Sequence, residues 1–253
     1  VAGLCAAYTA QERGHAVKLY EATDKPGGNM RLAAYPPGKG DITNMIRSYI
    51  TRCDKAGVEI ETNKEVTPED VKRQQPDAVI IATGSKTLYL PIEGIDHPDI
   101  IAGSDLLDGK RSAGTKVLVV GGGMVGCETA AFLGEQRHDV TVVEYRAVVG
   151  ADVIHEHRIM LMADFEEYKI KQVTGAKVVR FFPDGVEYET GDGSVHTLRG
   201  FDSVVLSMGY KSHNPFAQQP EQLGCATYVI GDAVQARRAL EATAEARAAA
   251  LQI

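Results

Sequence analysis

The stretch Val117-Leu-Val-Val-Gly121-Gly-Gly-Met-Val-Gly126-Cys-Glu128-Thr-Ala-Ala-Phe132 decides the fold of this chain. Its apolar, mostly β-branched start leads into the pattern G-x-G-x-x-G, and alanine-rich helical sequence follows. A second apolar run ends at Glu144, which is 18 residues after Gly126. A strand, a glycine turn, a helix, a second strand and a terminal acid together make the fingerprint of a dinucleotide-binding unit.

Each glycine of the fingerprint has a physical role. Gly121 permits the tight turn, Gly123 lets a pyrophosphate approach the backbone, and Gly126 lets the helix pack against its strand. The helix N-terminus, at Met124 and Val125, offers free N–H groups and partial positive charge to phosphates. The alternative for the same residues is an ordinary glycine-rich turn between a strand and a helix.

The terminal acid predicts which nucleotide is preferred. Glu144 is expected to accept hydrogen bonds from a ribose 2′-OH, and its charge disfavours the 2′-phosphate of NADPH. Glycine rather than alanine at Gly126 agrees with a preference for NADH. Arg146, two residues further on, would weaken that preference.

The beginning of the chain repeats this plan. When Gly3 is aligned with Gly126, Glu21 aligns with Glu144, and both copies have 18 residues between the glycine and the acid. By this alignment Gly3 is the third glycine of a first fingerprint. We therefore expect the first two glycines and the first strand of that copy to precede Val1.

A second part of the repeat lies downstream of each acid. Asp77-Ala-Val-Ile-Ile-Ala-Thr-Gly84 resembles Asp202-Ser-Val-Val-Leu-Ser-Met-Gly209, and these segments start 56 and 58 residues after the acids. The tandem repeat predicts an α/β fold with two Rossmann-like domains, the second inserted in the first. We expect the first domain to comprise residues 1–110 and 213–253, and the second residues 111–212.

Composition limits the classes of function. The net charge of −7 argues against a nucleic-acid surface. No apolar run approaches the ~20 residues of a membrane span. The cysteines lie too far apart for C-x-x-C, which indicates reduced thiols in a cytoplasmic protein and excludes a dithiol or a self-contained iron–sulfur site; they are Cys5, Cys53, Cys127 and Cys225.

Several further elements follow from local patterns. Asp41 begins a helix that Gly57 ends, and residues 152–168 form another helix. Residues 173–198 alternate and contain two glycine turns, which predicts a small antiparallel meander. Residues 227–230 form a strand, and we expect one long helix over 234–253 to follow it.

No side-chain set for acid–base, nucleophilic or metal chemistry is apparent, so we predict no catalytic residue and no metal site. The two histidines His155 and His157 are two residues apart on the expected helix, so they do not share a face. We interpret them as solvated.

Taken together, these motifs resemble the flavoproteins that have two dinucleotide-binding domains. That resemblance implies FAD in the first domain and NAD(H) in the second. It implies that Glu21 binds the adenosine ribose of FAD, that Asp232 contacts the ribityl chain or pyrophosphate, and that Glu128 lies near the nicotinamide. For Glu128 the alternative is a first-turn acid that complements the helix dipole. The other cofactor-binding residues implied are Gly3, Gly27, Gly28, Asn29, Ala82, Thr83, Gly84, Gly209 and Gly231.

The segments 27–31, 36–39 and 231–239 narrow the resemblance to the C-terminal half of the 2,4-dienoyl-CoA reductase and NADH:flavin oxidoreductase group. That group carries an N-terminal FMN barrel of the old yellow enzyme type and cysteines for a [4Fe–4S] cluster, neither of which is in this sequence. The resemblance implies an electron-input half that passes hydride from NADH to FAD, with the barrel as its partner; a homo-oligomer is compatible with it. Because we expect the first strand and the first two glycines of this copy to precede Val1, we expect this polypeptide to hold FAD weakly or not at all.

One relative suggests a different class of function. In trimethylamine dehydrogenase-like proteins the same two domains are a scaffold that holds an adenine nucleotide without nicotinamide chemistry. Under that interpretation the chain is a structural nucleotide-binding module rather than an enzyme.

Overall fold

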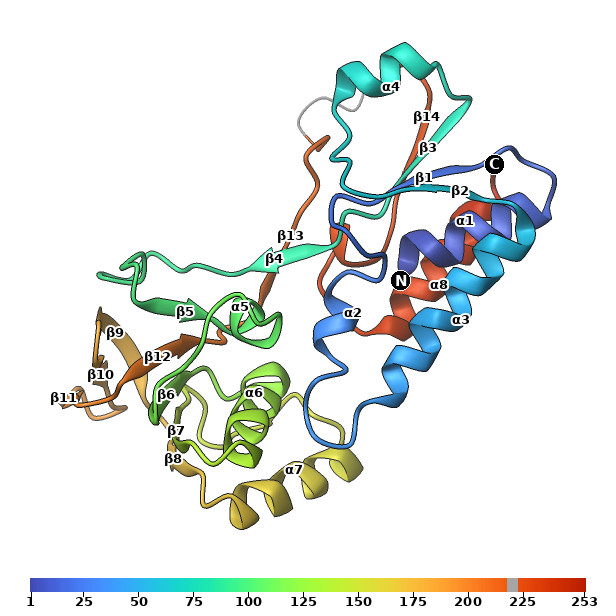
Figure 1. The fold of residues 1–253 in the computed structure, drawn as a ribbon. Helices are drawn as coiled ribbons and strands as arrows, with labels where there is room; N and C mark the ends of the chain where they lie inside the picture. Colours follow the sequence, from blue (N-terminus) through green and yellow to red (C-terminus); the bar gives the residue numbers. More distant parts are fainter. Residues whose placement is uncertain (218–222) are drawn as a thin grey trace. The chain divides into compact units, whose positions relative to one another are not determined.

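The computed structural model describes residues 1–217 and 223–253, which divide into two compact units. Unit 1 comprises residues 1–34, 41–86 and 210–253, and unit 2 comprises residues 35–40 and 87–209. Both units combine helices with parallel strands (Figure 1). The predicted fold class is confirmed.

The observed boundaries of the units differ from the expected ones. Residues 87–110 belong to unit 2, because strand β5 (Ile100–Ala102) pairs in parallel with β12 (Ser203–Leu206) of the second sheet. Residues 35–40 also belong to unit 2, although they lie far from it in sequence. Residues 35–40 and 87–110 both contain several prolines and glycines, which indicate turns. Their sequences do not show which unit these turns pack against.

Unit 2 is built on a five-stranded parallel sheet with the strand order β5-β12-β6-β7-β8. Strand β6 carries the first apolar run of the fingerprint, and β7 carries the second. The remaining bounds in this sheet and its helices are β6 Lys116–Val120, β7 Asp139–Val143, β8 Lys171–Val173, α5 Gly103–Leu107, α6 Met124–Glu135 and α7 His155–Glu167.

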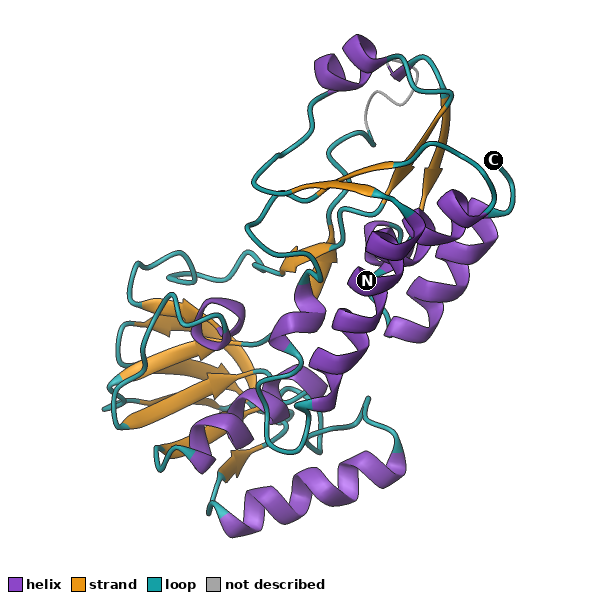
Figure 2. Ribbon diagram, turned by 45° about the vertical axis from the view of Figure 1, so that its right-hand side comes forward, coloured by secondary structure: helices purple, strands orange, loops and turns teal. Residues whose placement is uncertain are grey.

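Both faces of this sheet are covered, which explains why its strands are continuously apolar. Side chains on one face, such as Val117 and Val119, pack with the helices α5, α6 and α7. Those on the other face, such as Leu118 and Val120, pack with side chains of the small antiparallel sheet. Figure 2 shows the strands of the chain in orange and its helices in purple. The four side chains are at most 2% exposed.

The antiparallel meander is present, as predicted. Its strands are β9 (Lys177–Phe182), β10 (Gly185–Glu189) and β11 (Val195–Leu198), with β10 in the middle. It begins later than expected, because residues up to Val173 belong to β8 of the parallel sheet.

Unit 1 places helix α1 against α3 and α8. Helix α3 begins at Asp41, and Gly57 follows its last residue with a φ of +84°, as the sequence predicts. The bounds of its elements are α1 Ala2–Glu12, β1 Lys18–Tyr20, α2 Asn29–Leu32, α3 Asp41–Ala56, β2 Glu59–Glu61, α4 Pro68–Gln74, β3 Ala78–Ile81, β4 Ser85–Thr87, β13 Tyr210–Ser212, β14 Ala226–Val229, η2 Gly231–Ala233 and α8 Ala239–Ala250.

The two units differ at the centre of their sheets. In unit 2, β6 pairs with β7 on one side and β12 on the other. By the sequence repeat, β1 of unit 1 corresponds to β7, and β3 corresponds to β12. These two strands of unit 1 belong to separate parallel pairs, β1–β2 and β3–β14. No described strand of unit 1 takes the place that β6 has in unit 2.

The prediction of one long C-terminal helix over 234–253 is wrong about the residue at which the helix begins. A single turn of 3-10 helix spans Gly231–Ala233, and α8 begins only at Ala239. Asp232 stabilises the non-helical segment, because its carboxylate accepts a hydrogen bond from the backbone N–H of Arg237 at 3.1 Å. High alanine content thus predicts the helix but not its first residue.

Candidate functional site

The glycine turn of unit 2 is packed so tightly that two of its glycines have no room for a side chain. A Cβ on Gly126 would lie 1.8 Å from the carbonyl oxygen of Gly121, and one on Gly121 would lie 2.4 Å from the carbonyl oxygen of Ser207. Gly121 also has a φ of +105°, which L side chains rarely adopt. Helix α6 therefore starts directly on the turn, with Met124 and Val125 as its first residues.

The acid that ends β7 is bonded to this turn. The carboxylate of Glu144 accepts hydrogen bonds from the backbone N–H of Gly122 at 2.6 Å and of Arg146 at 2.8 Å. A carboxylate has about four acceptor positions, so two remain for a ribose. In unit 1, Glu21 has the matching contact, because the N–H of Thr23, also two residues further on, donates to it at 2.9 Å.

One residue at this turn was missed by sequence reasoning. The carboxylate of Asp152 accepts the N–H of Met124 at 3.0 Å through Oδ1 and 3.3 Å through Oδ2. A Cβ on Gly123 would lie 3.1 Å from the same carboxylate. An acid in a loop carries no periodic pattern; its position eight residues after Glu144 is the only available signal.

Glu128 lies at a cavity of about 350 Å³ within unit 2. Its carboxylate forms an ion pair with Lys39 and lies 3.6 Å from Nε2 of His157. The interpretation of Glu128 as a first-turn acid is wrong, because α6 begins at Met124 and Glu128 is its fifth residue. His157 is not fully solvated as predicted, since its side chain is 26% exposed and faces this carboxylate.

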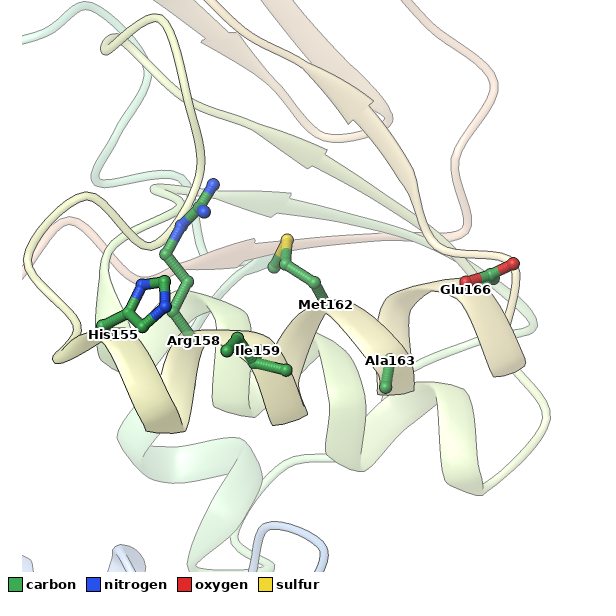
Figure 3. A pocket seen from close by; sticks show the side chains of 6 residues that line it. All are labelled: His155, Arg158, Ile159, Met162, Ala163 and Glu166. Atoms are coloured by element: carbon green, nitrogen blue, oxygen red, sulfur yellow. The ribbon is translucent and has the colours of Figure 1, made fainter.

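A second hollow, of about 400 Å³, runs along α7 (Figure 3). Arg158 points away from the helix and donates from Nε to the carbonyl of Val149 at 3.1 Å. All side chains that line the hollow come from this one helix, and none was predicted to bind a cofactor; they are His155, Arg158, Ile159, Met162, Ala163 and Glu166. We therefore place no site here.

Unit 1 brings three of its predicted segments together through a residue that the prediction omitted, Ser85. The amide of Asn29 donates to the backbone oxygen of Ser85 at 3.1 Å and to its hydroxyl at 3.2 Å. That hydroxyl donates to Asp232 at 3.0 Å. Thr83, two residues before Ser85, donates its hydroxyl to the carbonyl of His213.

The start of α1 is close to two further predicted residues. A Cβ on Gly3 would lie 3.3 Å from that of Ala82, and one on Gly231 would lie 3.0 Å from that of Ala2. Gly231 has a φ of +61° and donates its N–H to Glu245 at 2.8 Å. These contacts place Gly3, Ala82 and Gly231 at one end of the strand pair β3–β14.

The remaining predicted glycines hold unusual backbone conformations. Positive φ angles are found at Gly27, Gly28, Gly84 and Gly209, the last of which accepts a hydrogen bond from Leu88 at 2.9 Å. The predicted residues thus form two sets, one in each unit.

The cysteines are free thiols. Burial raises the pKa of Cys53 to about 11 and that of Cys127 to about 12, so both are protonated at neutral pH. Cys127 is fully buried and donates from Sγ to the carbonyl of Gly122 at 3.3 Å.

In residues 1–217 and 223–253 no group of at least three His, Cys, Asp or Glu side chains could hold a metal ion. Within the same ranges, no helix has the length and apolar character needed to cross a membrane.

Comparison with known proteins identifies relatives over the whole chain. An NADH oxidase of Thermoanaerobacter brockii is 34% identical over 258 residues, which cover 100% of this chain and 39% of that protein. A bilirubin reductase of Mediterraneibacter gnavus is 31% identical, with 92% of this chain and 36% of that protein covered. The chain therefore spans less than half the length of these relatives.

Solved structures agree with this relationship. A complex of 2-naphthoyl-CoA reductase with 2-naphthoyl-CoA matches with a TM-score of 0.94 and 30% identity, covering 100% of this chain and 38% of that one. Histamine dehydrogenase from Rhizobium sp. 4-9 matches with a TM-score of 0.86 and 20% identity, which shows the shared fold alone.

The family model described as pyridine nucleotide-disulphide oxidoreductase matches residues 1–245, and members of this family bind FAD and a pyridine nucleotide. The chain therefore belongs to the pyridine nucleotide-disulphide oxidoreductase family, among the two-domain flavoenzymes of the dienoyl-CoA reductase type.

Proposed function

We propose that this chain is the electron-input part of a flavin-dependent oxidoreductase, with NADH in unit 2 and FAD in unit 1. The observation that carries the proposal is the glycine turn of unit 2. There the packing of Gly121 against Gly126 and the bond between Gly122 and Glu144 hold the start of α6 directly against the turn, which is the backbone arrangement that binds a pyrophosphate. The similarity to an NADH oxidase supports the same nucleotide.

Unit 2 fits a pyridine dinucleotide through its backbone and one acid. Met124 and Val125 would direct N–H groups at the pyrophosphate, and Gly123 would allow close approach. Glu144 would accept the ribose hydroxyls with the acceptor positions that Gly122 and Arg146 leave free.

Unit 1 fits the flavin nucleotide through the residues joined by Ser85. The hydroxyl of Ser85 is hydrogen-bonded to both Asn29 and Asp232. The carboxylate of Asp232 is held at both oxygens, one by the hydroxyl of Ser85 and the other by the backbone N–H of Arg237. Glu21 would contact the adenosine ribose. When bound, the flavin would supply the hydride-accepting chemistry, and the residues of unit 1 would supply its orientation and electrostatics.

The larger size of the relatives suggests where the electrons go next. Because the chain covers 39% of the NADH oxidase and 38% of 2-naphthoyl-CoA reductase, we propose that it works with a further domain of the same enzyme. That domain would be an FMN barrel with a [4Fe–4S] cluster, as the resemblance implies.

The test is anaerobic reduction of the flavin. In the holoenzyme, NADH should bleach the flavin absorbance within the time of turnover. A structural nucleotide-binding module is the second candidate, as the resemblance to trimethylamine dehydrogenase-like proteins implies. A dimethylamine dehydrogenase of Hyphomicrobium sp. (strain x) is 24% identical to this chain over 299 residues. Flavin that dithionite reduces but NADH does not would support that module and contradict the oxidoreductase function.

We expect Glu144→Gln to reduce the preference for NADH over NADPH by about tenfold, because it removes the negative charge that repels a 2′-phosphate. Gly122 and Arg146 donate to different carboxylate oxygens of Glu144, so the amide oxygen of glutamine keeps one of these two bonds and loses the other. The unfolding temperature of the variant shows whether the turn is retained. Dissociation constants of both nucleotides, measured by fluorescence titration, provide the check. An unchanged ratio would show that Glu144 does not discriminate.

A further inference from the structure

The N-terminus of α6 already carries a negatively charged group of the protein itself. Asp152 accepts the N–H of Met124 with both carboxylate oxygens at 3.0 and 3.3 Å. Its carboxylate is also the nearest group to the space beside Gly123, 3.1 Å from where a Cβ would be. The first N–H groups of a helix have no partner within the helix and carry partial positive charge, so an anion is stabilised at this position.

This is the position that the fingerprint reserves for a pyrophosphate. The second glycine of the motif lets the pyrophosphate approach the backbone, and the helix start donates N–H groups to it. A phosphate oxygen and the carboxylate of Asp152 cannot both accept the N–H of Met124 in the same direction. A bound dinucleotide must therefore displace this side chain or lie against a like charge.

The backbone around Asp152 allows the side chain to move while the loop stays in place. Gly150 donates its N–H to the carbonyl of Gly122 at 2.6 Å, which anchors the loop to the glycine turn. Gly150 also accepts the N–H of Val153 at 3.1 Å, which closes a turn around Asp152. Asp152 itself is exposed to solvent, so its carboxylate can leave the helix end without unfolding that turn.

The internal repeat offers a natural comparison. Asp152 follows Glu144 by eight residues (152 − 144), and Asn29 follows Glu21 by eight (29 − 21). The alignment has no gap and places Gly27 opposite Gly150, both with positive φ. Unit 1 thus has a neutral amide where unit 2 has an acid, and that amide donates to Ser85.

We propose that Asp152 is a built-in competitor of the dinucleotide phosphates, which shortens the residence of the nucleotide in unit 2. The proposal rests on the proposed function of that unit. A nucleotide that delivers electrons must leave after each turnover, whereas the flavin nucleotide of unit 1 stays. The acid at 152 and the amide at 29 match this difference.

The decisive variant is Asp152→Asn, which installs the residue of unit 1. The amide oxygen still accepts the N–H of Met124, so the helix end stays capped while the negative charge is removed. We expect NADH and ADP-ribose to bind about 5- to 20-fold more tightly, within the range of single charges at helix ends, and we expect a slower dissociation rate in stopped-flow measurements. Adenosine, which has no phosphate, should bind with unchanged affinity.

Asp139→Asn is the matched control. It removes the same charge from the first residue of β7, at the opposite end of that strand from Glu144, where Asp139 forms an exposed ion pair with Lys171 at 2.7 Å. It should leave the affinity for NADH unchanged. Unfolding temperatures of both variants show whether the fold is retained.

These measurements distinguish the role of Asp152 as a competitor from the proposed binding of NADH by unit 2. Tighter binding of both phosphate-bearing probes to Asp152→Asn, with no change for adenosine or for Asp139→Asn, supports the competitor. Equal or weaker binding of NADH to Asp152→Asn overturns the competitor and leaves the NADH site in place. If neither the parent protein nor the variant binds NADH or ADP-ribose, both the inference and the proposed function fail.

Discussion

We expect Gly126→Ala to weaken NADH binding by about a hundredfold, equivalent to about 2.7 kcal/mol. The added Cβ would lie 1.8 Å from the carbonyl oxygen of Gly121 and 2.8 Å from its carbonyl carbon. Both are backbone atoms of the turn that receives the pyrophosphate, so no side chain can rotate away to make room. Helix α6 must withdraw from the turn, and the N–H groups of its first residues move with it.

The variant should still fold. Overpacking of this kind costs about 1–3 kcal/mol, and the sheet of unit 2 keeps its buried apolar strands. Valine at 126 should cost more than alanine, because it is larger and β-branched. Fluorescence titration with NADH measures the affinity, and urea unfolding measures the stability.

Gly191→Ala is the control for an added methyl group. Gly191 lies in the turn after β10, and a Cβ there would have no atom within 4 Å. Its affinity for NADH should equal that of the parent protein. If Gly126→Ala also binds NADH normally, the fingerprint has only an architectural role in this chain.

The sequence predicts the parts of the fold that depend on local pattern. Apolar runs identify β6 and β7, and the glycines between them identify the turn, because both are required by backbone geometry within a few residues. The repeat also predicts that Gly3 and Gly126 are equivalent. It does not predict that the two positions differ in their tolerance of a side chain. A Cβ on Gly3 would lie 3.3 Å from the Cβ of Ala82, whereas a Cβ on Gly126 would lie 1.8 Å from a backbone oxygen.

What the sequence did not reveal depends on contacts between distant segments. Asp152 and Ser85 are ordinary loop or strand-end residues until the chain folds and brings them to a helix end or to Asp232. The path of residues 35–40 is a similar case. Their prolines and glycines indicate a turn, but the unit that this turn packs on depends on contacts with distant residues, among them the ion pair between Lys39 and Glu128.

We expect Glu128→Ala to destabilise unit 2 by about 2 kcal/mol and to release residues 35–40. The side chain of Glu128 is 5% exposed and that of Lys39 is 22% exposed. Removing one partner of a fully buried pair costs about 3–5 kcal/mol, because a charge is left without compensation. The partial exposure of Lys39 reduces that cost, since water can solvate its ammonium group.

The measurements are urea unfolding and limited digestion with trypsin, which should cut after Lys39 faster in Glu128→Ala than in the parent protein. Glu135→Ala is the matched control, because it removes an exposed acid from the last residue of the same helix.

A double-mutant cycle with Lys39→Met measures the interaction energy between Lys39 and Glu128. Urea unfolding alone is used for this cycle, because Lys39→Met removes the trypsin site. Removing Lys39 should cost less than removing Glu128, because Lys39 is the more exposed partner and His157 remains 3.6 Å from the carboxylate. Once Lys39 is absent, the further cost of Glu128→Ala should fall by about 1 kcal/mol or more, a coupling typical of contacting residues. If the two substitutions instead add without coupling, the ion pair does not hold residues 35–40 on unit 2, and the apolar contacts of Pro36 and Pro37 at the same cavity must do so.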